Sequence, residues 1–82
     1  MVSVGASIKE TREGKKISLN TVSQNLHISI NFLESIENDD FSKMPGEAYT
    51  IGYIRSYSNY LDLNADDIVK LYKEQVFFAN QK

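Results

Sequence analysis

The chain has 82 residues, a formal net charge of −2 at pH 7, 41% apolar residues and 24% charged residues. This length permits one modest hydrophobic core, and the composition is that of a globular domain. The absence of cysteine excludes disulfides and thiolate sites, and the one histidine, His27, cannot supply a multi-histidine metal site. The longest apolar run, Val76–Ala79, is far shorter than the roughly 20 residues of a membrane-spanning helix. We therefore expect one soluble domain over residues 1–82 with no membrane span and no signal peptide.

Apolar residues recur at helical spacing along the chain, with one proline and four glycines to interrupt them. Ser18 and Ser29 are typical helix N-cap residues, and Pro45-Gly46 opens another helical segment. The sequence predicts an all-α domain with five short helices at about residues 6–15, 19–26, 29–38, 47–61 and 65–77. Val76 and Phe77 are expected to extend the buried face of the last helix.

The second and third expected helices are joined by the short segment His27-Ile28, which is the layout of a helix-turn-helix. The segment from residue 5 to residue 37 resembles the Cro/C1 repressor-like helix-turn-helix, with Ser18-Leu19 entering its second helix. That resemblance implies an ion pair between Arg12 and Glu37 that ties the first helix to the third. With the two helices expected after it, the chain has a helix-turn-helix core and two additional C-terminal helices. His27 departs from the pattern, because DNA-binding members usually have glycine in the turn.

The segment after Glu37 narrows the resemblance through an ordered series of short motifs. These are Asp40-Phe41, Met44-Pro45-Gly46, Tyr49, Gly52-Tyr53-Ile54-Arg55-Ser56-Tyr57 and Leu61-Asp62-Leu63. The series is similar to the cytoplasmic domain of RodZ-type bacterial cell-shape proteins. In that family the fourth helix docks on the actin-like filament protein MreB, which implies partner contacts at Tyr49 and Tyr53. Ile51 stands where family members commonly carry arginine.

RodZ-type proteins continue into a basic linker, one transmembrane helix and an extracytoplasmic domain. If this protein continues in the same way, the resemblance places the domain on the cytoplasmic face of the inner membrane.

The fourth helix carries more apolar surface than one core-facing side requires. At 100° per residue, its four tyrosines, at positions 49, 53, 57 and 60, fall within about 80° of one another. Either the helix is sandwiched and buries two sides, or part of the arc meets a partner, since tyrosine is enriched in binding hot spots. We expect Tyr57 and Ile54 in the core and Tyr49 and Tyr53 on the exposed edge. The predicted partner-binding residues are Tyr49, Tyr53, Ile51 and Tyr60.

Sequence-specific DNA binding is the alternative function of a helix-turn-helix. No lysine or arginine lies between residues 17 and 42, which hold four acids, whereas DNA affinity comes mostly from cations on phosphates. Nucleic acid is therefore an unlikely partner, although the basic residues of the first helix leave the alternative open. In this alternative the DNA-contacting residues would be Ser29, Asn31, Phe32 and Ser35.

No arrangement of residues indicates catalysis. The acids are scattered over helix faces, and no nucleophile has an evident base beside it. No glycine-rich phosphate loop is present, and Asn38-Asp39-Asp40 lacks the alternating ligands of a cation loop. We therefore expect no enzyme activity, no cofactor and no metal. The resemblance, together with the aromatic arc, implies a protein-interaction domain that links an MreB filament to the membrane. A scaffold for another membrane or division protein, binding through the same tyrosines, is a further alternative.

Overall fold

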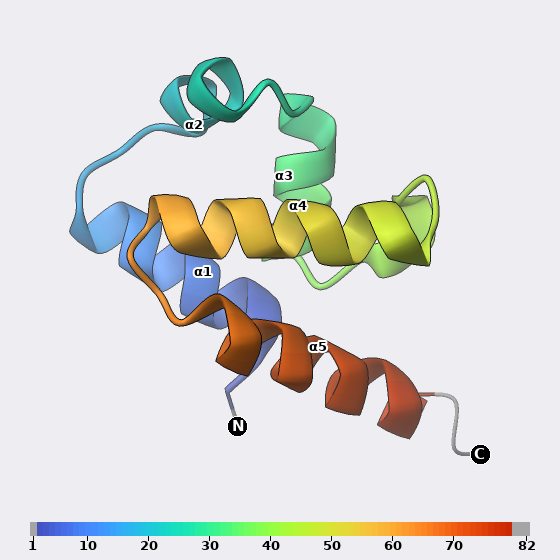
Figure 1. Cartoon of the computed structure of the whole chain (residues 1–82). Helices are drawn as coiled ribbons and strands as arrows, with labels where there is room; N and C mark the ends of the chain where they lie inside the picture. Colours follow the sequence, from blue (N-terminus) through green and yellow to red (C-terminus); the bar gives the residue numbers. More distant parts are fainter. Residues whose placement is uncertain (1, 80–82) are drawn as a thin grey trace.

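The computed structural model describes residues 2–79, and every regular element within them is a helix (Figure 1). The elements are α1 (Val4–Gly14), α2 (Leu19–Leu26), α3 (Ile30–Glu37), the 3-10 helix η1 (Phe41–Lys43), α4 (Glu47–Tyr60) and α5 (Ala65–Ala79). The predicted all-α class and the order of its five helices are confirmed. The short helix η1 was not predicted.

Serine side chains begin the first three helices. The hydroxyl oxygen of Ser3 accepts a hydrogen bond from the amide of Ala6, and this cap begins α1 at Val4 rather than at the predicted residue 6. Ser18 accepts from the amide of Thr21 and Ser29 from that of Asn31. Each serine satisfies an amide that has no carbonyl partner within its helix, which fixes where the helix starts.

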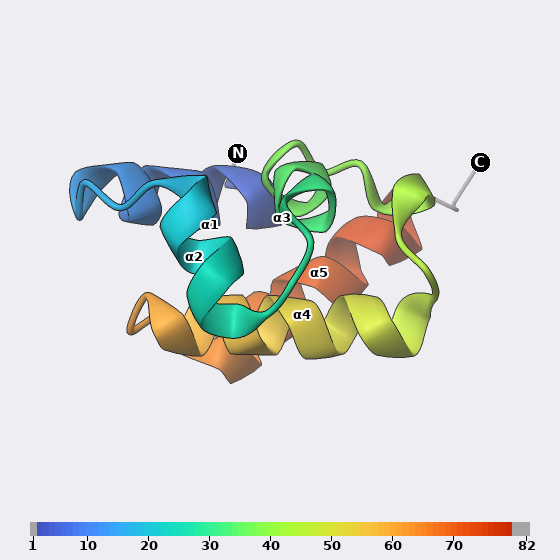
Figure 2. The ribbon, with the colours of Figure 1, turned by 90° about the horizontal axis from the view of Figure 1, so that it is seen from above.

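One hydrophobic core joins all five helices. In Figure 2, α1 and α4 lie on opposite sides of the molecule, and α2 runs from the side of α1 to that of α4, where it contacts α4. The largest side chains that are fully buried are Tyr57, Ile8, Leu33, Ile36, Ile54 and Leu61. Because α1, α3 and α4 all contribute to this set, the positions of α3 and α4 relative to each other are set by the core.

The turn between α2 and α3 is built on a left-handed residue. His27 has φ 57° and ψ 40°, a conformation in which an ordinary side chain is strained and glycine is not. This geometry explains why glycine suits the turn of related motifs and identifies His27 as an energetically costly departure.

Replacing His27 with glycine should stabilise the domain by about 1 kcal/mol, because glycine relieves the left-handed strain. Urea unfolding followed by circular dichroism measures this change. Gln24, an exposed residue within α2, provides the matched control. Gln24→Gly should destabilise by about 1 kcal/mol, because glycine is a poor helix former. Destabilisation by His27→Gly would contradict this account of the turn.

Candidate interaction surface

Three aromatic side chains form a continuous surface across α3 and α4. Tyr49 is 60% exposed, and its ring centroid lies 6.3 Å from that of Tyr53, one helical turn further along α4. The ring of Tyr53 is half-buried and stacks on Phe32 of α3, with centroids 5.8 Å apart and planes inclined by 28°. We call Phe32, Tyr49 and Tyr53 the aromatic surface. The sequence did not indicate that Phe32 and Tyr53 would meet, because they belong to helices separated by η1 and its flanking turns.

The other two predicted partner residues, Ile51 and Tyr60, are not part of the aromatic surface. Ile51 is half-buried and packs against the core. Tyr60 lies eleven residues after Tyr49, about 16 Å along the helix axis, and its hydroxyl accepts a hydrogen bond from Asn25 of α2 at 2.8 Å. The structure therefore brings Tyr49 and Tyr53 together but places Tyr60 near the other end of α4. Tyr57 is fully buried, as the sequence predicted.

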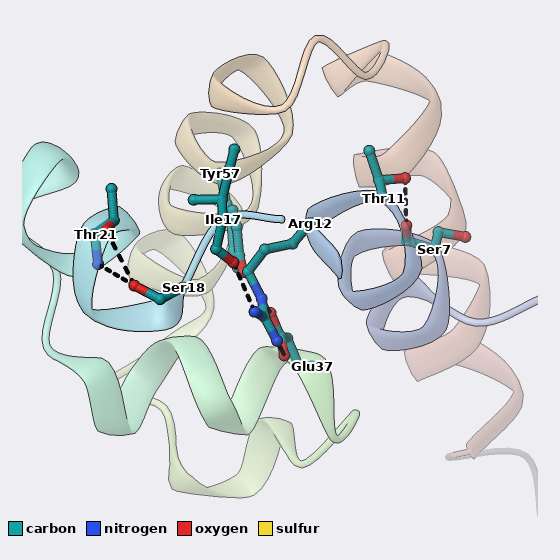
Figure 3. A network of polar contacts seen from close by, with 8 residues as sticks. All are labelled: Ser7, Thr11, Arg12, Ile17, Ser18, Thr21, Glu37 and Tyr57. Carbon is teal, nitrogen blue, oxygen red and sulfur yellow. Dashed lines mark hydrogen bonds and ion pairs between the residues drawn. The ribbon is translucent and has the colours of Figure 1, made fainter. Parts of the chain in front are cut away.

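A charged network joins α1, α3 and α4 (Figure 3). The Nε atom of Arg12 in α1 lies 2.7 Å from Oε2 of Glu37 in α3, and Nη2 lies 3.1 Å from Oε1. A third guanidinium nitrogen, Nη1, donates to the carbonyl of Ile17 at 2.9 Å. From α4, the Tyr57 hydroxyl donates to Oε2 of the same carboxylate. The two side chains that the resemblance pairs thus meet, and Tyr57 joins them.

Burial and charge stabilise the protonation states of this network. The hydrogen bonds to Glu37 raise the pKa of Arg12 above its usual value, against the opposing effect of burial. Burial, and then the Glu37 carboxylate, raise the pKa of Tyr57 far above the usual value. Tyr57 therefore remains a neutral donor and Arg12 a cation at any physiological pH.

The residues of the DNA-binding alternative do not form one exposed reading face. Asn31 is exposed, but Ser29 uses its hydroxyl as the N-cap of α3, and Phe32 stacks on Tyr53. Ser35 is only 8% exposed, and its hydroxyl donates to the carbonyl of Asn31 at 2.9 Å. Because Ser35 is buried and its hydroxyl already donates a hydrogen bond within α3, it cannot also donate one to a DNA base.

Asp39 links distant parts of the chain, a role that the sequence did not indicate. Its carboxylate accepts hydrogen bonds from the Ser3 hydroxyl at 2.7 Å, the Gly5 amide at 2.8 Å and the Gln75 side chain at 2.9 Å. Gln75 in turn accepts from the amide of Val4. The acid therefore supports the N-terminus of α1, where a negative charge is favourable. These partners lie more than thirty residues from Asp39 along the chain, so no local pattern reveals them.

A second group of exposed apolar side chains lies where α5 passes the start of the chain. Val2 is 65% exposed, Phe77 57% and Phe78 66%. The prediction that Phe77 extends the buried face of α5 is wrong, whereas Val76 is half-buried against the core. The rings of Phe77 and Phe78 contact each other edge to face, with centroids 5.6 Å apart.

Among residues 2–79, no group of three or more histidine, cysteine, aspartate or glutamate side chains is placed to hold a metal ion. Within the same residues no helix is both long and apolar enough to cross a membrane.

A family model described as a helix-turn-helix domain matches residues 7–68 of the chain. An uncharacterised protein of Haemophilus influenzae is 33% identical over 64 residues, which are 77% of this chain and 21% of that protein. The chain thus spans about a fifth of the length of this relative.

Two solved structures have the same fold. One is that of the bacterial actin MreB in complex with the cell-shape protein RodZ, with 32% identity, a TM-score of 0.86 and 93% of each chain covered. The other is YmfM of Staphylococcus aureus, described as a candidate DNA-binding membrane protein, with 26% identity, a TM-score of 0.83 and 89% of each chain covered. The family match and these structures together show that the chain belongs to the helix-turn-helix domain family and is a RodZ-like member of it.

Proposed function

We propose that this domain docks on a filament of the MreB type through the aromatic surface, with Tyr49 and Tyr53 as the central contacts. The observation that carries the proposal is the exposure of Tyr49, which is 60% accessible although its ring lies beside that of Tyr53. A large ring with a hydroxyl group combines apolar area with one hydrogen bond, and interface hot spots are rich in such side chains. The similarity to RodZ, solved in complex with MreB, supports this choice of partner.

We also propose that the domain is part of a longer protein and holds the filament at the cytoplasmic face of the membrane. Two facts support this extension: the chain spans 21% of its Haemophilus influenzae relative, and YmfM is described as a membrane protein. The domain acts here by binding alone, without catalysis or a cofactor.

Removing Tyr49 and Tyr53 together should weaken filament binding about thirtyfold, because truncating hot-spot side chains typically costs about 2 kcal/mol. The measurement is co-sedimentation of the Tyr49→Ala, Tyr53→Ala variant with polymerised MreB of the same organism. Tyr49→Ala alone should weaken binding without loss of stability, because most of that ring already lies in solvent.

The matched control removes two exposed rings from another part of the molecule. The variant Phe77→Ala, Phe78→Ala changes a similar exposed aromatic area at the end of α5 and should bind as the parent does. Unchanged binding by a folded Tyr49, Tyr53 variant would overturn the site assignment.

DNA binding remains the second candidate, because the fold is a helix-turn-helix and YmfM is described as a candidate DNA-binding protein. The charge distribution opposes it, since residues 17–42 hold four acids and no lysine or arginine. Titration of duplex DNA over a salt series separates the two functions. A tight complex whose affinity falls steeply with salt would favour this second candidate over filament docking.

A further inference from the structure

The exposed face of α3 forms one side of a hollow. Asn31, Glu34 and Asn38 lie three and four residues apart, so they form one stripe, and all three are exposed. Together with Phe32, and with Asp40 and Lys43 from the segment of η1, they line a hollow of about 400 Å³.

This hollow is continuous with the aromatic surface through Phe32. The Phe32 ring lines the hollow and also stacks on Tyr53, which is next to Tyr49. A partner that covers both tyrosines therefore also meets Phe32 of α3, because the ring of Phe32 directly contacts that of Tyr53. The docking area includes the helix that would read DNA in a repressor.

The charges of the hollow leave one acid unpaired. Asp40 accepts a hydrogen bond from the Ser42 hydroxyl at 2.7 Å, and its Oδ2 lies 3.4 Å from Nζ of Lys43. These contacts lower the pKa of Asp40 and keep it ionised. Glu34, by contrast, has no ion-pair partner anywhere in residues 2–79. Glu34 is exposed and lines the hollow together with Phe32.

We propose, on the basis of the docking function above, that the hollow receives a lysine or arginine side chain of the filament protein. Its cationic group pairs with the Glu34 carboxylate, and its aliphatic part lies on the ring of Phe32. Long cationic side chains combine an apolar stem with a charged end, and a phenylalanine face attracts a cation. A charge pair at the edge of an apolar contact fixes the register of the complex and accelerates association.

Three variants of the 82-residue chain test this assignment by co-sedimentation with polymerised MreB. Glu34→Gln should weaken binding about threefold, as for a partly exposed ion pair. Glu34→Lys should weaken it about tenfold or more, because two cations then face each other. Glu10→Lys is the control: it makes the same change of net charge at an exposed position of α1 outside the hollow, and should bind as the parent does. The parent should also lose more affinity than Glu34→Gln when the salt concentration is raised.

The outcomes separate this inference from the docking function. If the tyrosine variant binds weakly while Glu34→Lys binds as the parent does, the docking function holds and the cation assignment is wrong. Equal weakening by Glu34→Lys and Glu10→Lys would also overturn it, because the effect would then belong to net charge. If the tyrosine and Glu34 variants all bind normally, the docking function itself fails.

Discussion

Replacing Gly5 with alanine should destabilise the domain by roughly 3 kcal/mol, a large part of the stability of so small a protein. Gly5 lies where α1 crosses the end of α3. A Cβ atom on it would lie 2.3 Å from the carbonyl oxygen of Glu37 and 2.8 Å from that of Ile36. Both neighbours are backbone atoms of a helix, so they cannot turn aside as a side chain does. The two helices must move apart, which also lengthens the hydrogen bond from the Gly5 amide to Asp39.

Urea unfolding measures this effect, and Gly14 in the same helix provides the control. A Cβ atom on Gly14 would meet nothing within 4 Å. Gly14→Ala should therefore stabilise the domain by about 0.5 kcal/mol, because alanine restricts the unfolded chain. If the two alanine variants unfold at the same urea concentration, the close approach of α1 and α3 does not limit stability.

Removing the charge of Glu37 should also destabilise the domain by about 3 kcal/mol. The side chain of Glu37 is 4% exposed and that of Arg12 is 12% exposed, so neither is well hydrated. In the Glu37→Gln variant the buried guanidinium loses its counter-charge, and the amide cannot accept all three hydrogen bonds that the carboxylate accepts.

Glu34 offers a matched control for this change. It lies on the same helix, three residues before Glu37, but is exposed. Glu34→Gln should alter the free energy of unfolding by no more than about 0.5 kcal/mol. The double variant Arg12→Met, Glu37→Met should recover part of the loss, because no charge then remains buried without a partner. A Glu37→Gln variant as stable as Glu34→Gln would show that water replaces the carboxylate at no cost.

Local chemistry explains why much of the fold is predictable. Ser18 and Ser29 mark helix starts by their own side-chain hydrogen bonds, and apolar spacing indicates which faces are buried. These features depend on residues close together in the chain, so they can be recognised without knowledge of the tertiary structure. The pairing of Arg12 with Glu37 came from the family pattern and not from local spacing.

Features that depend on distant contacts were not predictable. The need for glycine at position 5 arises only when the backbone of α3 crosses α1. Likewise, the role of Asp39 could not be predicted, because its hydrogen-bond donors Ser3 and Gln75 come close to it only in the folded chain. At the candidate site, Tyr49 and Tyr53 followed from spacing and resemblance, whereas the stack of Tyr53 on Phe32 required the packing of α4 beside α3.

The meeting of Arg12, Tyr57 and Glu37 has a consequence for recognition. The Glu37 carboxylate accepts hydrogen bonds from Arg12 of α1 and Tyr57 of α4. The helices α3 and α4, which carry Phe32 and Tyr53, are therefore joined by a buried contact. The aromatic surface is thus assembled in the free protein, and association does not have to order its two halves. Less conformational entropy is lost on binding, so even a small contact area gives useful affinity.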